Sequence, residues 1–192
     1  MEDQPLEPGR TAVLIMDYQN DIVAMTGDRA DALLDKATQV LAAARKAAMP
    51  VIYITVGFRP GYPEVSARNK SFSGIRESGR LAPGSAGAEV HSAVAPHDKD
   101  IVVVKHRVGA FSGTDLEMIL RAHDIDTLVL LGIATSGVVL STVRHAADHD
   151  YRLIVLKDCC ADADPDVHRC LTDKVLARQA TVTTADEFLK YL

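Results

Sequence analysis

The chain has 192 residues, and its 21 Lys and Arg against 26 Asp and Glu give a formal net charge of −5. A hydrophobic fraction of 47% and a charged fraction of 24% are typical of a folded protein, which excludes disorder for most of the chain. The acidic balance argues against nucleic-acid binding, which needs a basic surface. No apolar run approaches the roughly 18–20 residues that span a bilayer, so we expect no membrane partner.

The cysteines and the first residues predict the compartment. The chain starts with polar and acidic residues, unlike the basic and then apolar start of a signal peptide. Its three cysteines, Cys159, Cys160 and Cys170, do not make a disulfide framework. We therefore expect a cytoplasmic protein with reduced thiols, and the length suits a single domain over residues 1–192.

Short apolar runs alternate with longer helical patterns, which predicts strand–helix–strand units and a mostly parallel sheet. In the first part of the chain, Thr11–Met16 is expected to be a buried strand, residues 29–47 a helix and Val51–Val56 a second strand. Residues 57–86 are dense in Gly, Pro and Ser and show no period, so we expect an irregular excursion there. Its basic excess (Arg59, Arg68, Lys70, Arg76 and Arg80) favours either attraction of a carboxylate substrate or plain solvation.

The second half continues the alternation. Ile101–Val104 predicts a third strand, and Thr114–Glu117 has the form of a capping box that starts a helix running to about Ala122. Thr127–Leu131 predicts a fourth strand, which leads into the turn Gly132–Gly137. The remaining expected elements are a helix over 138–149, a strand Arg152–Leu156, a helix Asp166–Arg178, a short strand Ala180–Val182 and a terminal helix.

Polar groups follow three of these strands at their carboxyl ends: Asp17, Lys105 and the turn that begins at Gly132. Ligands of open parallel sheets bind at this edge, so the three features converge if the strands are neighbours. A lysine favours the ionised carboxylate, whereas burial raises its pKa. Such opposed effects suit a carboxyl group to proton transfer near neutral pH, although a structural ion pair is the alternative.

The chain resembles the isochorismatase-like, or cysteine hydrolase, family over roughly residues 10–185. The resemblance implies a three-layer α/β/α fold with a six-stranded parallel sheet. It is carried by three motifs in order: Val13-Leu-Ile-Met-Asp17-Tyr-Gln19-Asn-Asp21; Val104-Lys105 with Ala110-Phe111 and Thr114-Asp-Leu; and Leu131-Gly132-Ile-Ala-Thr135 with Ser141-Thr142 and Ala146-Ala-Asp-His-Asp-Tyr151.

The resemblance also implies roles for individual residues. Asp17 would be the catalytic acid or base and Lys105 its partner, with Gln19 and Phe111 lining the pocket. The residues by themselves are also consistent with Phe111 as plain core and with Gln19 bonded to turn backbone. A cis peptide would fall at Ile133–Ala134 and aim the backbone N–H groups of Ala134 and Val138 at a developing oxyanion. Ile133 and Thr135, which flank Ala134, are expected to bind substrate.

Two positions depart from the family pattern. Amidase members carry the nucleophilic cysteine where this chain has Val138, and valine can neither attack a carbonyl nor carry an acyl group. True isochorismatases also lack that cysteine and cleave a vinyl ether, but they usually carry glycine there. Ile22 stands where the family usually has Phe. These changes leave the substrate open.

We expect no metal and no cofactor. Amidases of the nicotinamidase branch bind a metal through Asp-x-His, whereas the matching stretch here is Val56-Gly-Phe-Arg-Pro60. His145 and His149 have a spacing able to ligate a metal, but no third ligand is evident, which favours an exposed helix face.

These observations predict a cofactor-independent hydrolase for a small, carboxylate-bearing substrate, with Asp17 as general acid and no covalent thioester. The alternatives are a non-catalytic ligand-binding or scaffolding member and an amidase with a displaced thiol at Cys159 or Cys160. The resemblance further implies a homo-oligomer, a dimer or higher.

Overall fold

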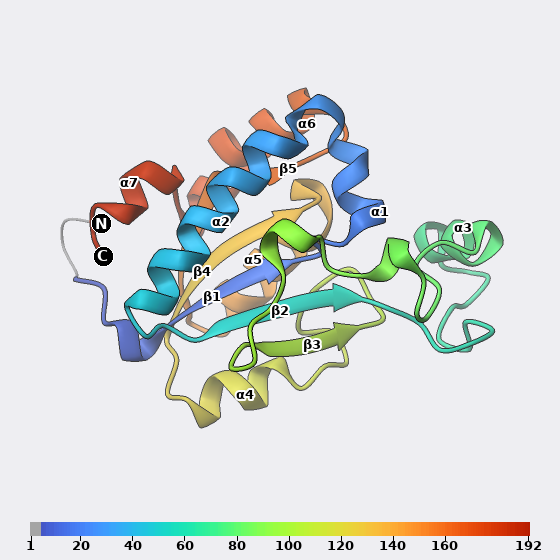
Figure 1. Ribbon diagram of the computed structural model, residues 1–192, viewed down its shortest axis with the longest axis horizontal. Helices are drawn as coiled ribbons and strands as arrows, with labels where there is room; N and C mark the ends of the chain where they lie inside the picture. The colour runs from blue at the N-terminus through green and yellow to red at the C-terminus, as the bar shows by residue number, and fades with distance from the viewer. Residues whose placement is uncertain (1–4) are drawn as a thin grey trace.

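The computed structural model describes residues 5–192, in which a parallel sheet lies between two layers of helices (Figure 1). The six strands have the order β3-β2-β1-β4-β5-β6, and every neighbouring pair is parallel. This confirms the predicted three-layer α/β/α architecture. The strands are β1 (Thr11–Met16), β2 (Val51–Val56), β3 (Ile101–Lys105), β4 (Thr127–Ile133), β5 (Arg152–Ala161) and β6 (Thr181–Thr183).

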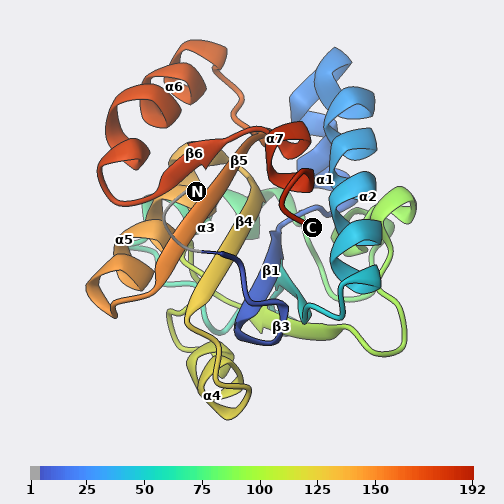
Figure 2. The same cartoon turned by 90° about the vertical axis from the view of Figure 1, so that its left-hand side faces the viewer.

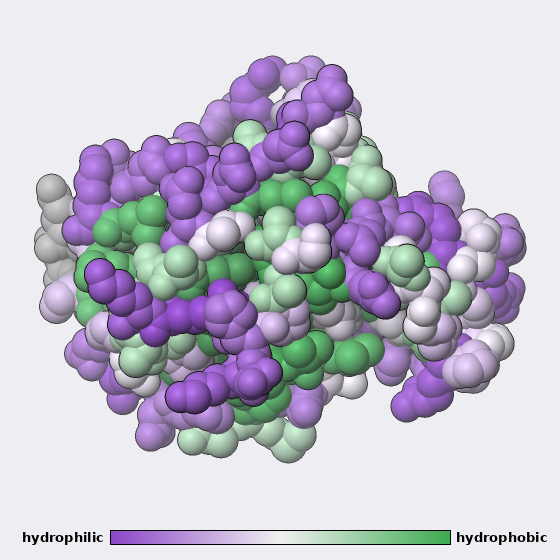
Figure 3. Space-filling view, in the orientation of Figure 1, coloured by the Kyte–Doolittle hydropathy of each residue, from purple (hydrophilic) through white to green (hydrophobic). Residues whose placement is uncertain are grey.

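Both faces of the sheet are covered by helices, as Figure 2 shows edge-on. Helices α2 (Ala30–Lys46) and α7 (Ala185–Leu189) pack on one face, and α4 (Leu116–Ala122) and α5 (Leu140–Asp148) pack on the other. Every residue of β1 and β4 is buried, as expected for central strands covered on both sides. The outward surface of α2 is hydrophilic (Figure 3). Among residues 5–192, no helix combines the length and apolar character needed to cross a membrane.

Several elements differ from the sequence prediction. Helix α4 ends at Ala122 as predicted but begins at Leu116. The Thr114 hydroxyl accepts from the backbone N–H of Leu116, not of Glu117, and donates to the carbonyl of Ala110, so the capping box does not form as predicted. The expected helix over 138–149 is preceded by a π-helical turn, Thr135–Val139. The expected helix over 166–178 is divided into α6 (Pro165–Cys170), a π-helical turn over 171–175 and a 3-10 turn over 176–178.

Residues 57–86 are not wholly irregular, because they contain helix α3 (Lys70–Ser78). The side chain of Asn69 accepts a hydrogen bond from the backbone N–H of Phe72 at the start of this helix. Gly79 ends it in the left-handed conformation, with φ +66°. The excursion has a small apolar cluster of its own, which includes Phe58 and Phe72, and α3 lies beyond the carboxyl edge of the sheet in Figure 1.

Candidate active site

Asp17 and Lys105 meet at the carboxyl edge of the sheet. Asp17 directly follows β1 with φ +60°, which turns the chain away from the strand direction, and its backbone N–H donates to the carbonyl of Ile54. Lys105 is the last residue of β3. β2 lies between these two strands, so they are not neighbours, yet the long lysine side chain places Nζ 2.9 Å from Asp17 Oδ2. The two groups therefore converge as the sequence predicted.

The pair is almost completely withdrawn from water, with exposed fractions of 5% for Asp17 and 2% for Lys105. Burial raises the pKa of Asp17 to about 6, against the lowering effect of the charge and hydrogen bond of Lys105. Lys105 Nζ also donates to the carbonyl of Arg107, 3.0 Å away. Asp17 Oδ1 is buried and has no hydrogen-bond partner among the described residues. One carboxylate oxygen is thus held by the lysine while the other remains available.

A cavity of about 310 Å³ lies beside this pair. Its wall is largely apolar and is drawn from loops and strand ends that are far apart in the sequence. The lining residues are Asp17, Ile22, Met25, Thr26, Val56, Phe72, Ile75, Arg80, Leu81, Lys105, Val108, Ile133, Ala134 and Ala163. This volume is at the lower end of the range for small-molecule pockets.

The 57–86 excursion forms one wall of the cavity, through Phe72, Ile75, Arg80 and Leu81. Of the basic residues in the excursion, Arg80 alone lines the cavity. Its guanidinium lies 2.9 Å from the Asp21 backbone carbonyl and 3.6 Å from the Asp21 carboxylate. Sequence reasoning missed the apolar members of this wall. The pair of helix signals at Asn69 and Gly79 would have revealed α3, which carries Phe72 and Ile75.

The turn after β4 closes the cavity on another side. The peptide bond between Ile133 and Ala134 is cis, as the resemblance implied, and both residues line the cavity. Gly132 allows the close approach of the following π-helical turn. A Cβ at that position would lie 2.8 Å from Val139 Cγ2, which is too close for a real contact.

The residues after β5 hold this turn in place. A 2.8 Å hydrogen bond joins the fully buried Thr135 hydroxyl to Nδ1 of His168, and the backbone N–H of Ser136 donates to Asp162 Oδ2 at 2.7 Å. Burial lowers the pKa of His168, which favours a neutral ring at neutral pH. Thr135 therefore acts on the shape of the turn and is not among the residues that line the cavity.

Three other expected site residues lie outside the cavity wall. Gln19 is buried, and its side-chain amide bonds the N–H and carbonyl of Val56 and the carbonyl of Ala88. It therefore ties loop backbone together next to the pair. Phe111 stacks on His145 in the core below the sheet, and the Val138 side chain is buried in the same core.

None of the three cysteines, all within the described residues, lines the cavity. Cys159 and Cys160 lie inside β5, which extends five residues beyond the predicted strand, and both are buried. Burial raises the pKa of both thiols, that of Cys160 to about 12. Such thiols are poor nucleophiles. Cys170 is exposed on α6.

Comparison with known proteins identifies the family of the chain. Residues 11–187 match the isochorismatase domain. The chain belongs to the isochorismatase family. It is 31% identical over 188 residues to the isochorismatase family protein YecD of Escherichia coli O157:H7, with coverage of 95% of this chain and 96% of that protein.

The chain is also similar to proteins named as hydrolases. The ureidoacrylate amidohydrolase RutB of Methylobacterium radiotolerans is 32% identical over 186 residues, which cover 85% of this chain and 72% of that protein. The crystal structure of a cysteine hydrolase from Pseudomonas syringae pv. phaseolicola 1448A superposes with a TM-score of 0.89 at 28% identity. That superposition covers 98% of this chain and 94% of the other.

Proposed function

We propose that this isochorismatase-family hydrolase cleaves a small enol ether that carries a carboxylate, with Asp17 as proton donor and no covalent enzyme intermediate. The observation that carries the proposal is that the two carboxylate oxygens of Asp17 have different hydrogen-bond partners. Oδ2 is bound to Lys105, whereas Oδ1 has no partner among the described residues and Asp17 borders an apolar cavity. A carboxyl group whose pKa is about 6 can hold and release a proton near neutral pH.

The reaction begins with transfer of the Asp17 proton to the terminal carbon of the enol ether double bond. The positive charge that forms on the adjacent carbon is shared with the ether oxygen, and water adds there to give a hemiketal. Breakage of the hemiketal C–O bond, with transfer of the hemiketal hydroxyl proton to the leaving oxygen, then releases an alcohol and a keto acid. The other proton of the attacking water returns to Asp17. Lys105 stabilises the Asp17 carboxylate between the two proton transfers. The Ala134 backbone N–H is the candidate donor to the leaving oxygen.

Charge at the cavity supports a carboxylate on the substrate. Lys105 Nζ is already bound to Asp17 Oδ2 and to the carbonyl of Arg107, which leaves it less available to a substrate carboxylate. Arg80 donates to the Asp21 carbonyl at 2.9 Å but lies 3.6 Å from the Asp21 carboxylate, and its side chain is 44% exposed. A guanidinium in this position suits a bidentate contact with a carboxylate, while Phe72, Ile75 and Leu81 would contact the apolar part of the molecule.

The proposed reaction uses no thiol. The resemblance puts the amidase nucleophile at Val138, and the two buried cysteines, Cys159 and Cys160, point to inert side chains closing a strand. The similarity to ureidoacrylate amidohydrolase makes amide hydrolysis the second candidate, and it would then need water as the attacking group. The two candidates differ in substrate and can be separated directly.

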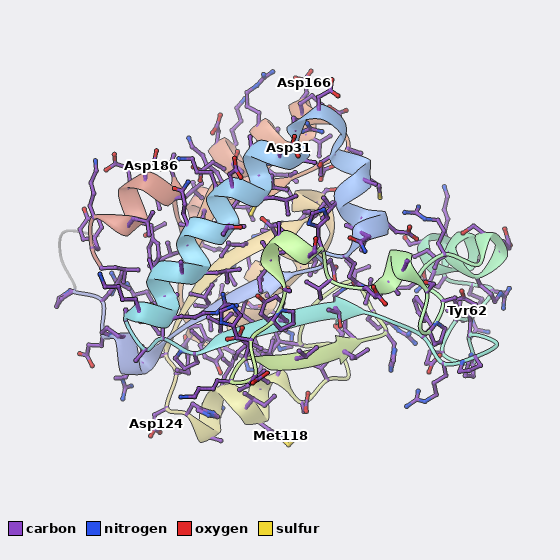
Figure 4. The ribbon with its side chains drawn as sticks, viewed as in Figure 1. Asp31, Tyr62, Met118, Asp124, Asp166 and Asp186 are labelled. Atoms are coloured by element: carbon purple, nitrogen blue, oxygen red, sulfur yellow. The ribbon has the colours of Figure 1, made fainter. Side chains whose placement is uncertain are left out.

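The test incubates the protein with isochorismate, with ureidoacrylate and with a panel of simple amides, and follows the products by chromatography. We expect turnover of the enol ether, its loss in Asp17→Asn, and no loss in Asp31→Asn, which changes an exposed carboxylate on α2 (labelled in Figure 4). Treatment with iodoacetamide should leave the rate unchanged. Near-normal turnover by Asp17→Asn would refute the mechanism. Inactivation through Cys159 or Cys160 would indicate a displaced thiol, and binding without turnover a non-catalytic member.

A further inference from the structure

A second cluster of reactive side chains lies where α4 passes α5, outside the cavity wall. Glu117 of α4 faces His145 and His149 at the carboxyl end of α5, and one ligand atom from each of the three lies within 4.8 Å of the others. His149 Nδ1 is 3.5 Å from Glu117 Oε1. Figure 4 labels Met118, the neighbour of Glu117, at the lower edge of the molecule, away from the excursion marked by Tyr62.

The backbone that carries this cluster is firmly anchored. Leu116 and Leu120 of α4 and Val143 and Ala146 of α5 are buried in one continuous core beneath the sheet. Because each ligating residue is next to a buried anchor in its helix, or within one turn of one, the relative positions of the three side chains are constrained.

The ring of His145 is held on both faces. It stacks on Phe111 with a centroid distance of 4.5 Å and an interplanar angle of 13°, and on His149 with 4.4 Å and 9°. An imidazole nitrogen binds a metal in the plane of its ring, so these two nearly parallel rings must tilt apart to share one ion.

We propose that Glu117, His145 and His149 bind a divalent transition-metal ion, with Zn²⁺ as the best match. Two imidazoles and one carboxylate are a ligand set that Zn²⁺ uses in proteins, and three protein ligands leave a fourth position for water. Atoms about 2.1 Å from a tetrahedral ion lie roughly 3.4 Å apart. Closing the present 4.8 Å spread to that value requires the His145 and His149 rings to turn out of their stack.

Arg121 competes with a metal for the carboxylate. Its guanidinium donates to Glu117 Oε1 from 3.2 and 3.3 Å, four residues along the same helix. A bound ion would displace Arg121 or use the second carboxylate oxygen. Removal of the guanidinium should therefore strengthen metal binding.

The experiment titrates Zn²⁺ into the tag-free, chelator-stripped protein, with calorimetry and a competing chromophoric chelator as readouts. We expect Glu117→Gln, His145→Gln and His149→Gln each to weaken binding by at least about 10-fold. His123→Gln, an exposed histidine at the end of α4 outside the cluster, should bind as the wild type does, and Arg121→Gln should bind more tightly. Zn²⁺ should also raise the melting temperature of the wild type, since the ion ties α4 to α5.

All of these side chains are at least partly exposed, so the variants should fold. Equal melting temperatures without metal check this point. Absence of Zn²⁺ binding to the wild type, or equal affinity in the wild type and all three ligand variants, would overturn the proposal. Loss of binding in His123→Gln alone would do the same, because it would place the ion elsewhere.

Discussion

Lys105→Met removes the charge that faces Asp17 but keeps a long side chain in the same buried space. In the wild type, Asp17 holds its proton more tightly in the folded than in the unfolded chain, because its pKa is raised from 3.8 to about 6. Its contribution to the free energy of unfolding is therefore complete below pH 3.8 and is lost as the pH rises through about 6. Lys105 is the main group that opposes the raising of this pKa by burial, so without it the loss should continue to higher pH.

The size of the stability difference between the wild type and Lys105→Met follows from the charge states of Asp17 and Lys105. At pH 5 the variant can keep Asp17 protonated, so its cost is that of a lost hydrogen bond and contacts, about 1–2 kcal/mol. Above pH 6 the wild-type Asp17 is ionised, whereas the variant must either hold the proton or bury an unpaired charge. The stability difference should then widen by up to about 1.4 kcal/mol for each pH unit. At pH 8 it should reach about 3–5 kcal/mol, the usual cost of breaking a buried ion pair.

Urea denaturation at pH 5, 6, 7 and 8 measures this difference for the wild type and Lys105→Met. Lys46→Met, which changes an exposed lysine near the end of α2, is the matched control and should show a small, constant difference. A gap between the wild type and Lys105→Met that stays the same from pH 5 to pH 8 would refute the proposed electrostatic coupling.

Two further substitutions test the turn after β4 and the cavity wall. Gly132→Ala should destabilise the fold by about 1–3 kcal/mol, because the added Cβ would lie 2.8 Å from Val139 Cγ2. Gly74→Ala, with open space around the new methyl group, should not, and urea denaturation compares the two. Arg80→Gln should raise KM for a carboxylate substrate by about 10-fold or more, in keeping with loss of a charge-assisted contact of about 1.5–3 kcal/mol. Steady-state kinetics should show a much smaller effect for Arg76→Gln, which lies outside the cavity wall; equal effects would count against a carboxylate contact at Arg80.

The sheet and the acid–base pair could be predicted because the strands and the positions of their carboxyl ends can be identified from the sequence. Continuous apolar runs identified the central strands, and a parallel sheet brings the carboxyl ends of its strands to one edge. Strand order was not available from the pattern, and the reach of the Lys105 side chain across β2 is what makes the order β3-β2-β1 compatible with the pair.

Features that depend on contacts between distant segments were not predictable in the same way. Glu117 looked like a capping residue, because the sequence does not show that α5 places His149 3.5 Å from it. The sequence pattern at Phe111 and Gln19 is compatible with residues that line a pocket and with residues that support the structure around it. Only the packed structure assigns Phe111 to a ring stack with His145 and Gln19 to loop backbone.

The claim that Asp17 donates the proton is tested most directly by the pH dependence of kcat/KM for enol ether hydrolysis between pH 4.5 and 8.5. This parameter reports the protonation state of the free enzyme. We expect a plateau at low pH and a decline of about tenfold per unit above a midpoint near 6, where Asp17 loses its proton. A rate that is independent of pH across this range, or that rises with pH, would contradict the role of Asp17 as the acid.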